Sequence, residues 1–135
     1  MKKALLIVLC FALLFSLVAC SGYVSSYKAL MFVREERSDH ANIRFSGFEG
    51  TYVMKLKMKS EGKEGSIHCV ASLEEGEVNV WYDALGTKEL LFNLKAGESI
   101  DERLGYFESG KTVYIIVETV TPAKEGRISV DLRQA

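Results

Sequence analysis

The apolar residues of this chain recur at every second position from Tyr27 onward. Residues 51–59 show the pattern most clearly, because Tyr52, Met54, Leu56 and Met58 alternate with Thr51, Val53, Lys55, Lys57 and Lys59. A period of two places successive side chains on opposite faces of a β-strand, whereas a helix repeats every 3.6 residues. The pattern therefore predicts strands that each have one buried and one solvated face.

Glycine-containing polar segments separate these alternating runs. They include residues 47–50, 61–65, 74–76 and 83–86, which we interpret as turns. The first run, residues 27–34, could instead form a helix that continues through Arg37, and residues 98–107 are difficult to assign. The expected strands are residues 27–34, 42–46, 51–59, 66–73, 78–83, 90–94, 112–120 and 126–132.

Short strands at regular spacing, with no helical period, predict an all-β domain over residues 27–135. We expect a two-sheet antiparallel β-sandwich, jelly-roll or Ig-like, with about eight strands. The run Val113–Val117 is almost continuously apolar, so it should form a central strand covered on both faces.

The N-terminus has a different pattern. Lys2 and Lys3 precede an apolar run over residues 4–19 that is interrupted only by Ser16. Sixteen helical residues extend about 24 Å, which is less than the roughly 30 Å of a bilayer core. We interpret residues 1–19 as a secretory signal peptide. The alternatives are an ordinary cleaved signal peptide in which Cys20 is incidental, and an uncleaved anchor helix.

The end of this run, Leu17-Val18-Ala19-Cys20, resembles the lipobox of bacterial lipoproteins. The resemblance implies cleavage before Cys20 and a membrane anchor made of diacylglycerol and further acyl chains such as palmitate on that cysteine. Residues 20–26 would then be the lipidated cysteine and a short tether. Ser21 replaces the aspartate that retains many lipoproteins in the inner membrane. The expected location is therefore extracytoplasmic, on the outer membrane or the cell membrane.

Removal of residues 1–19 changes the charge and thiol content. Without Lys2 and Lys3, 15 basic side chains face 18 acidic ones, a net charge of −3. Nucleic-acid-binding domains are usually clearly basic, so we expect no nucleic-acid partner. Cys10 is lost with the signal peptide and Cys20 carries lipid, which leaves Cys69 as the only thiol. Because Cys69 lies on the apolar side of its strand, we expect it to be buried in the core.

The expected sandwich loosely resembles small β-sandwich domains of bacterial lipoproteins, carbohydrate-binding modules and pre-peptidase C-terminal modules. The shared features are the hairpin Asp83…Gly86 followed by Leu91-Phe92, and the strand Tyr114-Ile115-Ile116-Val117-Glu118. These features imply a fold and no individual site residue.

Residues that could support catalysis or hold a metal are widely separated in the sequence. His40 and His68 lie 28 positions apart, and no zinc or EF-hand spacing occurs. The sequence also lacks a nucleophile elbow. We therefore expect no catalytic residue, no metal site and no cofactor. Calcium on Asp83 with Glu108, or on Asp101 with Glu102, is the alternative to simple solvation of these acids.

The most suggestive binding residue is Trp81. Alternation places it on the solvated face with Asn79 and Asp83, opposite Val78, Val80 and Tyr82. An aromatic ring beside amide and carboxylate groups can stack on a sugar and hydrogen-bond its rim, so we interpret Asn79, Trp81 and Asp83 as a candidate ligand-binding site. Alternatively, a loop or the N-terminal segment covers Trp81, since sandwiches often bury their tryptophan.

Lys55, Lys57 and Lys59 form a basic stripe on one strand. The stripe could face anionic lipids or wall polymers. It could also be a solvated face, or an edge strand whose lysines prevent further strand pairing.

Together these features predict a lipid-anchored, non-catalytic binding or accessory module of the cell envelope, with glycan as a candidate ligand. The alternatives are a structural or interaction subunit of an envelope protein complex, an exported hydrolase, or an enzyme inhibitor.

Overall fold

The computed structural model describes residues 23–58 and 64–134, which form an all-β, antiparallel fold, as predicted. The expected signal peptide lies outside these residues. Within the two described ranges, no helix has the length and apolar character needed to cross a bilayer. The strands are β1 (Ser26–Leu30), β2 (Val33–Glu36), β3 (His40–Lys57), β4 (Glu64–Asp83), β5 (Glu89–Lys95), β6 (Ser99–Glu108) and β7 (Thr112–Gln134).

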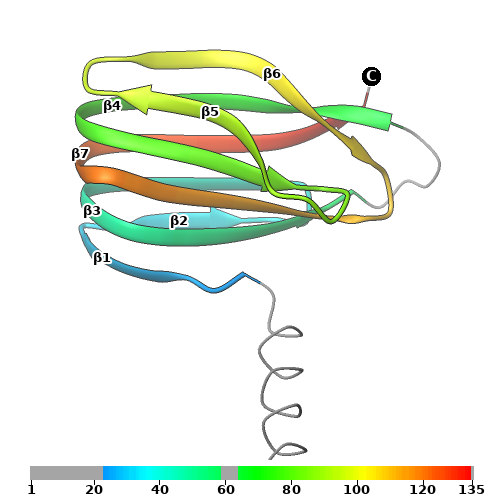
Figure 1. The fold of residues 1–135 in the computed structure, drawn as a ribbon, viewed down its shortest axis with the longest axis horizontal. Helices are drawn as coiled ribbons and strands as arrows, with labels where there is room; N and C mark the ends of the chain where they lie inside the picture. Colours follow the sequence, from blue (N-terminus) through cyan, green and yellow to red (C-terminus); the bar gives the residue numbers. More distant parts are fainter. Residues whose placement is uncertain (1–22, 59–63, 135) are drawn as a thin grey trace, which may run out of the picture.

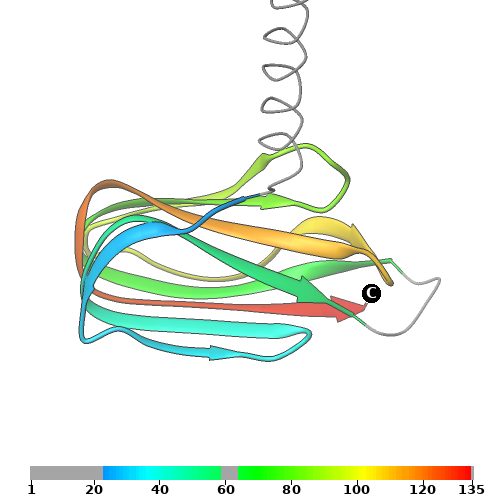
Figure 2. The same ribbon diagram turned by 90° about the horizontal axis from the view of Figure 1, so that it is seen from below.

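Three long strands, β3, β4 and β7, pass through both layers of a sandwich (Figures 1 and 2). Each half of β7 pairs with β3 on one side and with β4 on the other. Layer one contains the first halves of β3 and β4, the second half of β7, and β2 and β6 at its edges. Layer two contains the remaining halves, with β1 and β5 at its edges. The sandwich is therefore one sheet folded over on itself.

The fold-over corrects two predicted turns, at residues 47–50 and 74–76, and the expected break around Pro122 between the strands 112–120 and 126–132. Each is a bend within a continuous strand, and the ladders shift register between Phe48 and Thr51 and between Glu75 and Val78. Gly50 and Gly76 have φ of 121° and 91°. Glycine adopts such angles without strain, so it can bend a strand as readily as it can end one.

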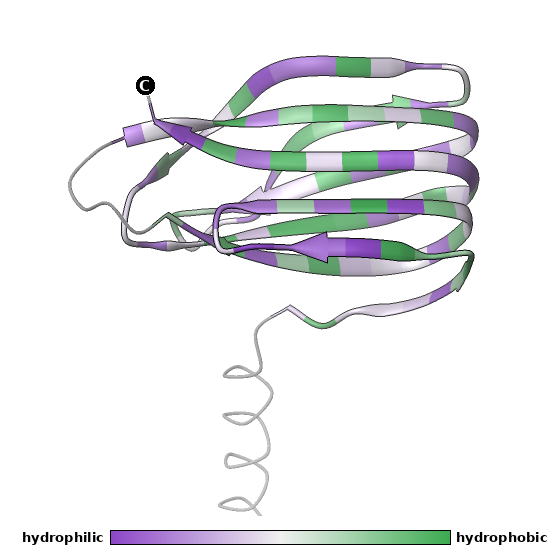
Figure 3. Ribbon diagram, turned by 180° about the vertical axis from the view of Figure 1, so that it is seen from behind, coloured by the Kyte–Doolittle hydropathy of each residue, from purple (hydrophilic) through white to green (hydrophobic). Residues whose placement is uncertain are grey.

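The core lies between the two layers and contains predicted inward positions together with residues from expected turns and from β6, such as Phe48 and Phe107. Tyr52, Met54 and Leu56 are buried, as are the corresponding residues of β4 and β7. Hydrophobic and hydrophilic residues accordingly alternate along the strands in Figure 3. Cys69 is a free, buried thiol, as predicted, and burial raises its pKa to about 12. Its thiol therefore stays neutral and packs as a small apolar group.

Two segments differ from the expected strand assignment. The predicted strand 27–34 is divided at Met31, whose φ is 52°, into β1 and β2, both of which pair with β3. The difficult segment 98–107 forms β6. This strand is mostly exposed and lies at a sheet edge, so its sequence lacks the regular apolar alternation of a half-buried strand.

We predict that Gly76→Ala destabilises the domain more than Gly97→Ala. Both glycines have positive φ, which costs an alanine about 1–2 kcal/mol. A Cβ at Gly76 would also lie 2.3 Å from the Pro122 carbonyl oxygen, whereas a Cβ at Gly97 would meet no atom within 4 Å. This overpacking should add about 1–3 kcal/mol. Denaturant unfolding measures the difference, and equal losses of stability would contradict the role of Gly76 in the bend.

Candidate functional site

Trp81 lies on the outer face of layer two, in the second half of β4. Val78 and Val80 point into the core, while Asn79 and Trp81 point outward and are half-buried. Trp81 pairs in register with Ile116 of β7 and Leu90 of β5. The predicted orientation of Asn79 and Trp81 therefore agrees with the structure.

A β-bulge beside Trp81 shapes this face. The register of β4 and β5 shifts between Val80 and Trp81, so that Leu91 is the extra residue of β5. Leu91 and Phe92 are consequently both buried, and Leu90 turns outward with 50% exposure. Bulges re-aim side chains in this way. The result is an apolar residue next to the tryptophan ring.

A lysine from the loop before β5 partly covers Trp81. The Nζ atom of Lys88 lies 4.7 Å from the centroid of the indole ring and 4.0 Å from Oε2 of Glu118. The indole Nε1 of Trp81 is buried, and within residues 23–58 and 64–134 it has no hydrogen-bond partner. A buried unpaired donor costs about 1–3 kcal/mol. The structure thus combines the two sequence interpretations of Trp81, an exposed ring and a ring covered by a loop. The ring faces outward, and a loop residue lies over it.

Asp83 has a different role from the one predicted. It is buried, and its carboxylate accepts hydrogen bonds of 2.7 Å from the Tyr23 hydroxyl and 2.7 Å from the Gly86 amide. The bond to Gly86 stabilises the predicted turn. With both oxygens engaged, the carboxylate is held by the protein itself and is unsuited to bind a ligand.

The N-terminal segment contacts this face. Residues 23–26, expected to belong to the tether, lie against layer two in the structure. The ring of Tyr23 lies 5.3 Å from that of Tyr114, and the Val53 amide donates a hydrogen bond of 2.9 Å to Ser25 Oγ. The hydrogen bond to Asp83, together with some burial, raises the pKa of Tyr23 to about 12. Tyr23 is therefore fixed on the domain.

Polar side chains border the tryptophan. Asn93 donates through Nδ2 to Asn79 Oδ1 at 2.8 Å and to Glu77 Oε2 at 2.9 Å. Lys55 Nζ lies 5.7 Å from the Tyr114 ring centroid. Ile116 points outward, yet it is only 2% exposed among its neighbours. We call the following group the Trp81 face: Lys55, Asn79, Trp81, Lys88, Leu90, Asn93, Tyr114, Ile116 and Glu118.

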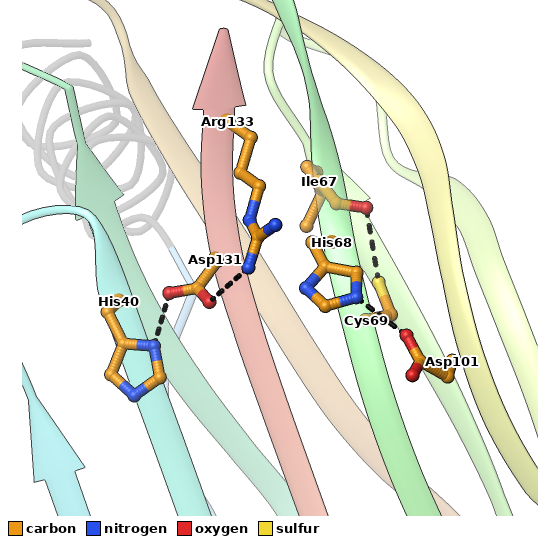
Figure 4. Close-up of polar contacts among 7 residues, drawn as sticks. All are labelled: His40, Ile67, His68, Cys69, Asp101, Asp131 and Arg133. Atoms are coloured by element: carbon orange, nitrogen blue, oxygen red, sulfur yellow. Dashed lines mark hydrogen bonds and ion pairs between the residues drawn. The ribbon is translucent and has the colours of Figure 1, made fainter.

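The two histidines lie on the opposite face, in layer one (Figure 4). His40 Nδ1 hydrogen-bonds to Asp131 Oδ1, and His68 Nε2 to Asp101 Oδ1 at 2.7 Å. Cys69 points the other way, into the core, with Sγ 3.6 Å from the Ile67 carbonyl oxygen. Among the residues that the structure describes, no sulfur nucleophile therefore faces either imidazole.

The aspartate of each acid pair proposed for calcium is engaged elsewhere. Asp83 is bound by Tyr23 and Gly86, and Asp101 by His68. In the described part of the chain, no cluster of three or more His, Cys, Asp or Glu side chains is arranged to hold a metal ion.

The basic stripe lies on the same face as Trp81. Lys55 and Lys57 are exposed, and Lys59 lies outside the described residues. The pairing of β1 with β3 ends at Thr51, so residues 53–57 pair only with β7. This part of β3 is a sheet edge, as one of the two interpretations of the stripe predicted.

Sequence reasoning missed Tyr23 and Lys88 as parts of this face. An aromatic residue in an otherwise small and polar tether was the available signal for Tyr23. Its partner Asp83 is 60 residues away, so the contact itself could not be derived. Lys88 lies in an exposed loop whose path no local pattern specifies.

No protein-family model matches the chain, and no curated protein is significantly similar to it. Among solved structures, it is similar to family 29 carbohydrate-binding modules. One is a variant complexed with mannohexaose, with 18% identity over 83% of this chain and 79% of that chain, and a TM-score of 0.41. Another, complexed with cellulohexaose, has 17% identity, covers 83% and 78%, and also scores 0.41. Similarity at this level carries no argument about function.

We predict that Tyr23→Phe lowers the free energy of unfolding by about 1 kcal/mol, because it removes a hydrogen bond to a buried carboxylate. Tyr27→Phe is the matched control, since the ring of Tyr27 packs on Phe32, Phe48 and Tyr52. Denaturant unfolding at neutral pH provides the comparison. Equal stability of Tyr23→Phe and wild type would show that the contact contributes nothing.

The same variant gives a pH dependence. A pKa raised from 10 to about 12 means that the neutral Tyr23 phenol is favoured by folding. The contribution of the neutral Tyr23 phenol to the stability of the folded state is therefore complete below pH 10 and is lost as the pH rises from 10 to 12. The stability difference between wild type and Tyr23→Phe should therefore shrink over that interval. A difference that stays constant up to pH 12 would contradict the Tyr23–Asp83 assignment.

Proposed function

We propose that this chain is a lipid-anchored, non-catalytic binding domain of the cell envelope, with glycan as its ligand and the Trp81 face as its binding surface. The observation that carries the proposal is the outward-facing, half-buried Trp81, bordered by amide, carboxylate and ammonium groups. Aromatic surfaces of this kind bind the C–H face of a sugar ring, while polar neighbours bind its hydroxyls.

The main obstacle to stacking is Lys88, and it is a movable one. Residues 85–90 are all exposed, so the lysine side chain can leave the ring. The lost cation–π contact would cost about 0.5–1 kcal/mol at such a site. A sugar hydroxyl that reached the indole Nε1 would offset this cost, because it would supply the acceptor that the buried donor lacks.

The lipid anchor rests on the sequence Leu17-Val18-Ala19-Cys20. Two acyl chains give durable membrane attachment, since each buried methylene contributes about 0.8 kcal/mol. Non-catalytic action is supported by the placement of His40 and His68, which hydrogen-bond to aspartates on the face opposite Trp81.

A second candidate function is an interaction subunit of an envelope complex. The connection between β1 and β2 exposes three apolar side chains close together in sequence: Leu30, Met31 and Val33 are 71%, 79% and 55% exposed. An exposed apolar cluster of this kind is a common feature of protein interaction sites.

A glycan and wall-polymer binding screen tests the proposed function. We predict that the protein binds at least one sugar polymer or oligosaccharide and that Trp81→Ala abolishes this binding, because stacking surface is lost. Val70→Ala should bind normally, since Val70 lies on the outer face of layer one. Lys88→Ala should retain or strengthen binding.

The wild-type protein must be shown to be folded in the same screen. If it binds no glycan while Trp81→Ala only lowers thermal stability, the glycan function is contradicted. The Leu30–Met31–Val33 cluster would then be the surface to pursue.

A further inference from the structure

We propose that the Trp81 face rests on the membrane and that Lys55 and Lys88 bind anionic phospholipid headgroups there. The proposal rests on the lipid anchor of the proposed function and does not require glycan binding. It assigns an orientation to the domain and a lipid partner to its cationic groups.

The first argument is the length of chain between the anchor and the domain. Tyr23 is held by Asp83, Tyr114 and, through Ser25, by the backbone of β3. Three residues span at most about 11 Å, so a lipidated Cys20 lies within that distance of Tyr23. The N-terminal end of the described chain lies on the outer side of layer two, which is the upper layer in Figure 2. That side must therefore lie close to the bilayer.

The second argument is the chemistry of the face. Two ammonium groups lie over aromatic rings, Lys88 over Trp81 and Lys55 over Tyr114. Lysines near an anionic leaflet contribute about 1 kcal/mol each, and tryptophan and tyrosine favour the membrane interface. Leu90, which pairs in register with Trp81 on this face, is 50% exposed. Cationic, interfacial and apolar groups thus occur together where the tether brings the membrane.

Acidic side chains also lie on and beside this face. Asp83 is buried and hydrogen-bonded, whereas Glu118 lies 4.0 Å from Lys88 and its side chain is 41% exposed against 36% for the lysine. Glu77 accepts a hydrogen bond from Asn93.

The outer face of layer one carries Asp101 and Asp131, which hydrogen-bond to the histidines, and also the exposed arginines Arg44, Arg127 and Arg133. The short tether, and not net charge, therefore selects layer two as the face toward the bilayer. Packed sheets lie about 10 Å apart, so the outer face of layer one would be directed away from the bilayer.

The orientation also bears on the ligand. A sugar bound at Trp81 would have to come from the membrane surface, for example from a glycolipid headgroup. The outer face of layer one would remain available to soluble or wall-bound partners.

The experiment uses the lipidated protein, extracted from membranes and reconstituted in phosphatidylcholine vesicles with and without phosphatidylglycerol. Trp81 is the only tryptophan of the chain, so its fluorescence reports on this face alone. A fraction of the lipids carries a spin label on the headgroup, which quenches nearby indoles. The matched control is Trp81→Phe combined with Val70→Trp, which moves the indole to layer one.

We expect strong quenching of Trp81, increased by phosphatidylglycerol and reduced by salt, and weak quenching at position 70. The double variant Lys55→Gln with Lys88→Gln should weaken docking of the Trp81 face on the bilayer about fivefold for each lysine removed. Lys124→Gln should leave docking unchanged. Lys124 pairs with Glu75 at the strand bend and serves as the charge-matched control. Salt sensitivity is expected because these lysines are exposed.

Quenching that is equal at both positions, or absent at Trp81 while the protein stays on the vesicles, would overturn the orientation. A protein that does not remain on the vesicles would overturn the anchor, and with it this proposal. If the control variant fails to fold, the rate of acetylation of each lysine in the lipidated wild-type protein gives a second measurement. Lys55 and Lys88 should become protected on vesicles relative to Lys124, and unchanged reactivity would contradict the proposal.

Discussion

The passage of the same three strands through both layers is the constraint on which this structure depends. Because β7 lies between β3 and β4 in each layer, the bends of all three strands must coincide. The Gly50 amide donates to Thr119 Oγ1 at 2.9 Å, which joins two of the bends. Backbone angles that favour glycine at Gly50 and Gly76 allow the ladders to continue through the fold.

Folding one sheet over in this way produces two outer faces of different chemistry. Layer two presents aromatic rings with lysines over them, and layer one presents histidine–aspartate pairs and exposed arginines. The hydrogen bond between Tyr23 and Asp83 holds the N-terminal end of the described chain at layer two. Our proposals for the orientation of the domain and for its lipid partner follow from the position of Tyr23 at layer two, because an anchor at Cys20 cannot lie far from Tyr23.

Alternation in the sequence was sufficient to predict the inward faces of the strands and the outward orientation of Trp81, because side-chain direction depends only on residue parity within a strand. It could not distinguish a turn from a bend, since Gly76 and Pro122 disrupt a regular strand in either case. It also could not assign Asp83, whose partner Tyr23 is distant in sequence, or the bulge that buries Leu91 beside Phe92. These features depend on contacts that exist only after folding.

The proposed anchor, orientation and location all depend on the chemistry of Cys20. Mass spectrometry of the protein extracted from membranes provides the test. We predict an N-terminal peptide that begins at Cys20 and carries a diacylglyceryl group on its sulfur. A soluble, unmodified product, or a chain that retains Met1, would contradict the proposed anchor, the orientation of the Trp81 face and the location of the domain.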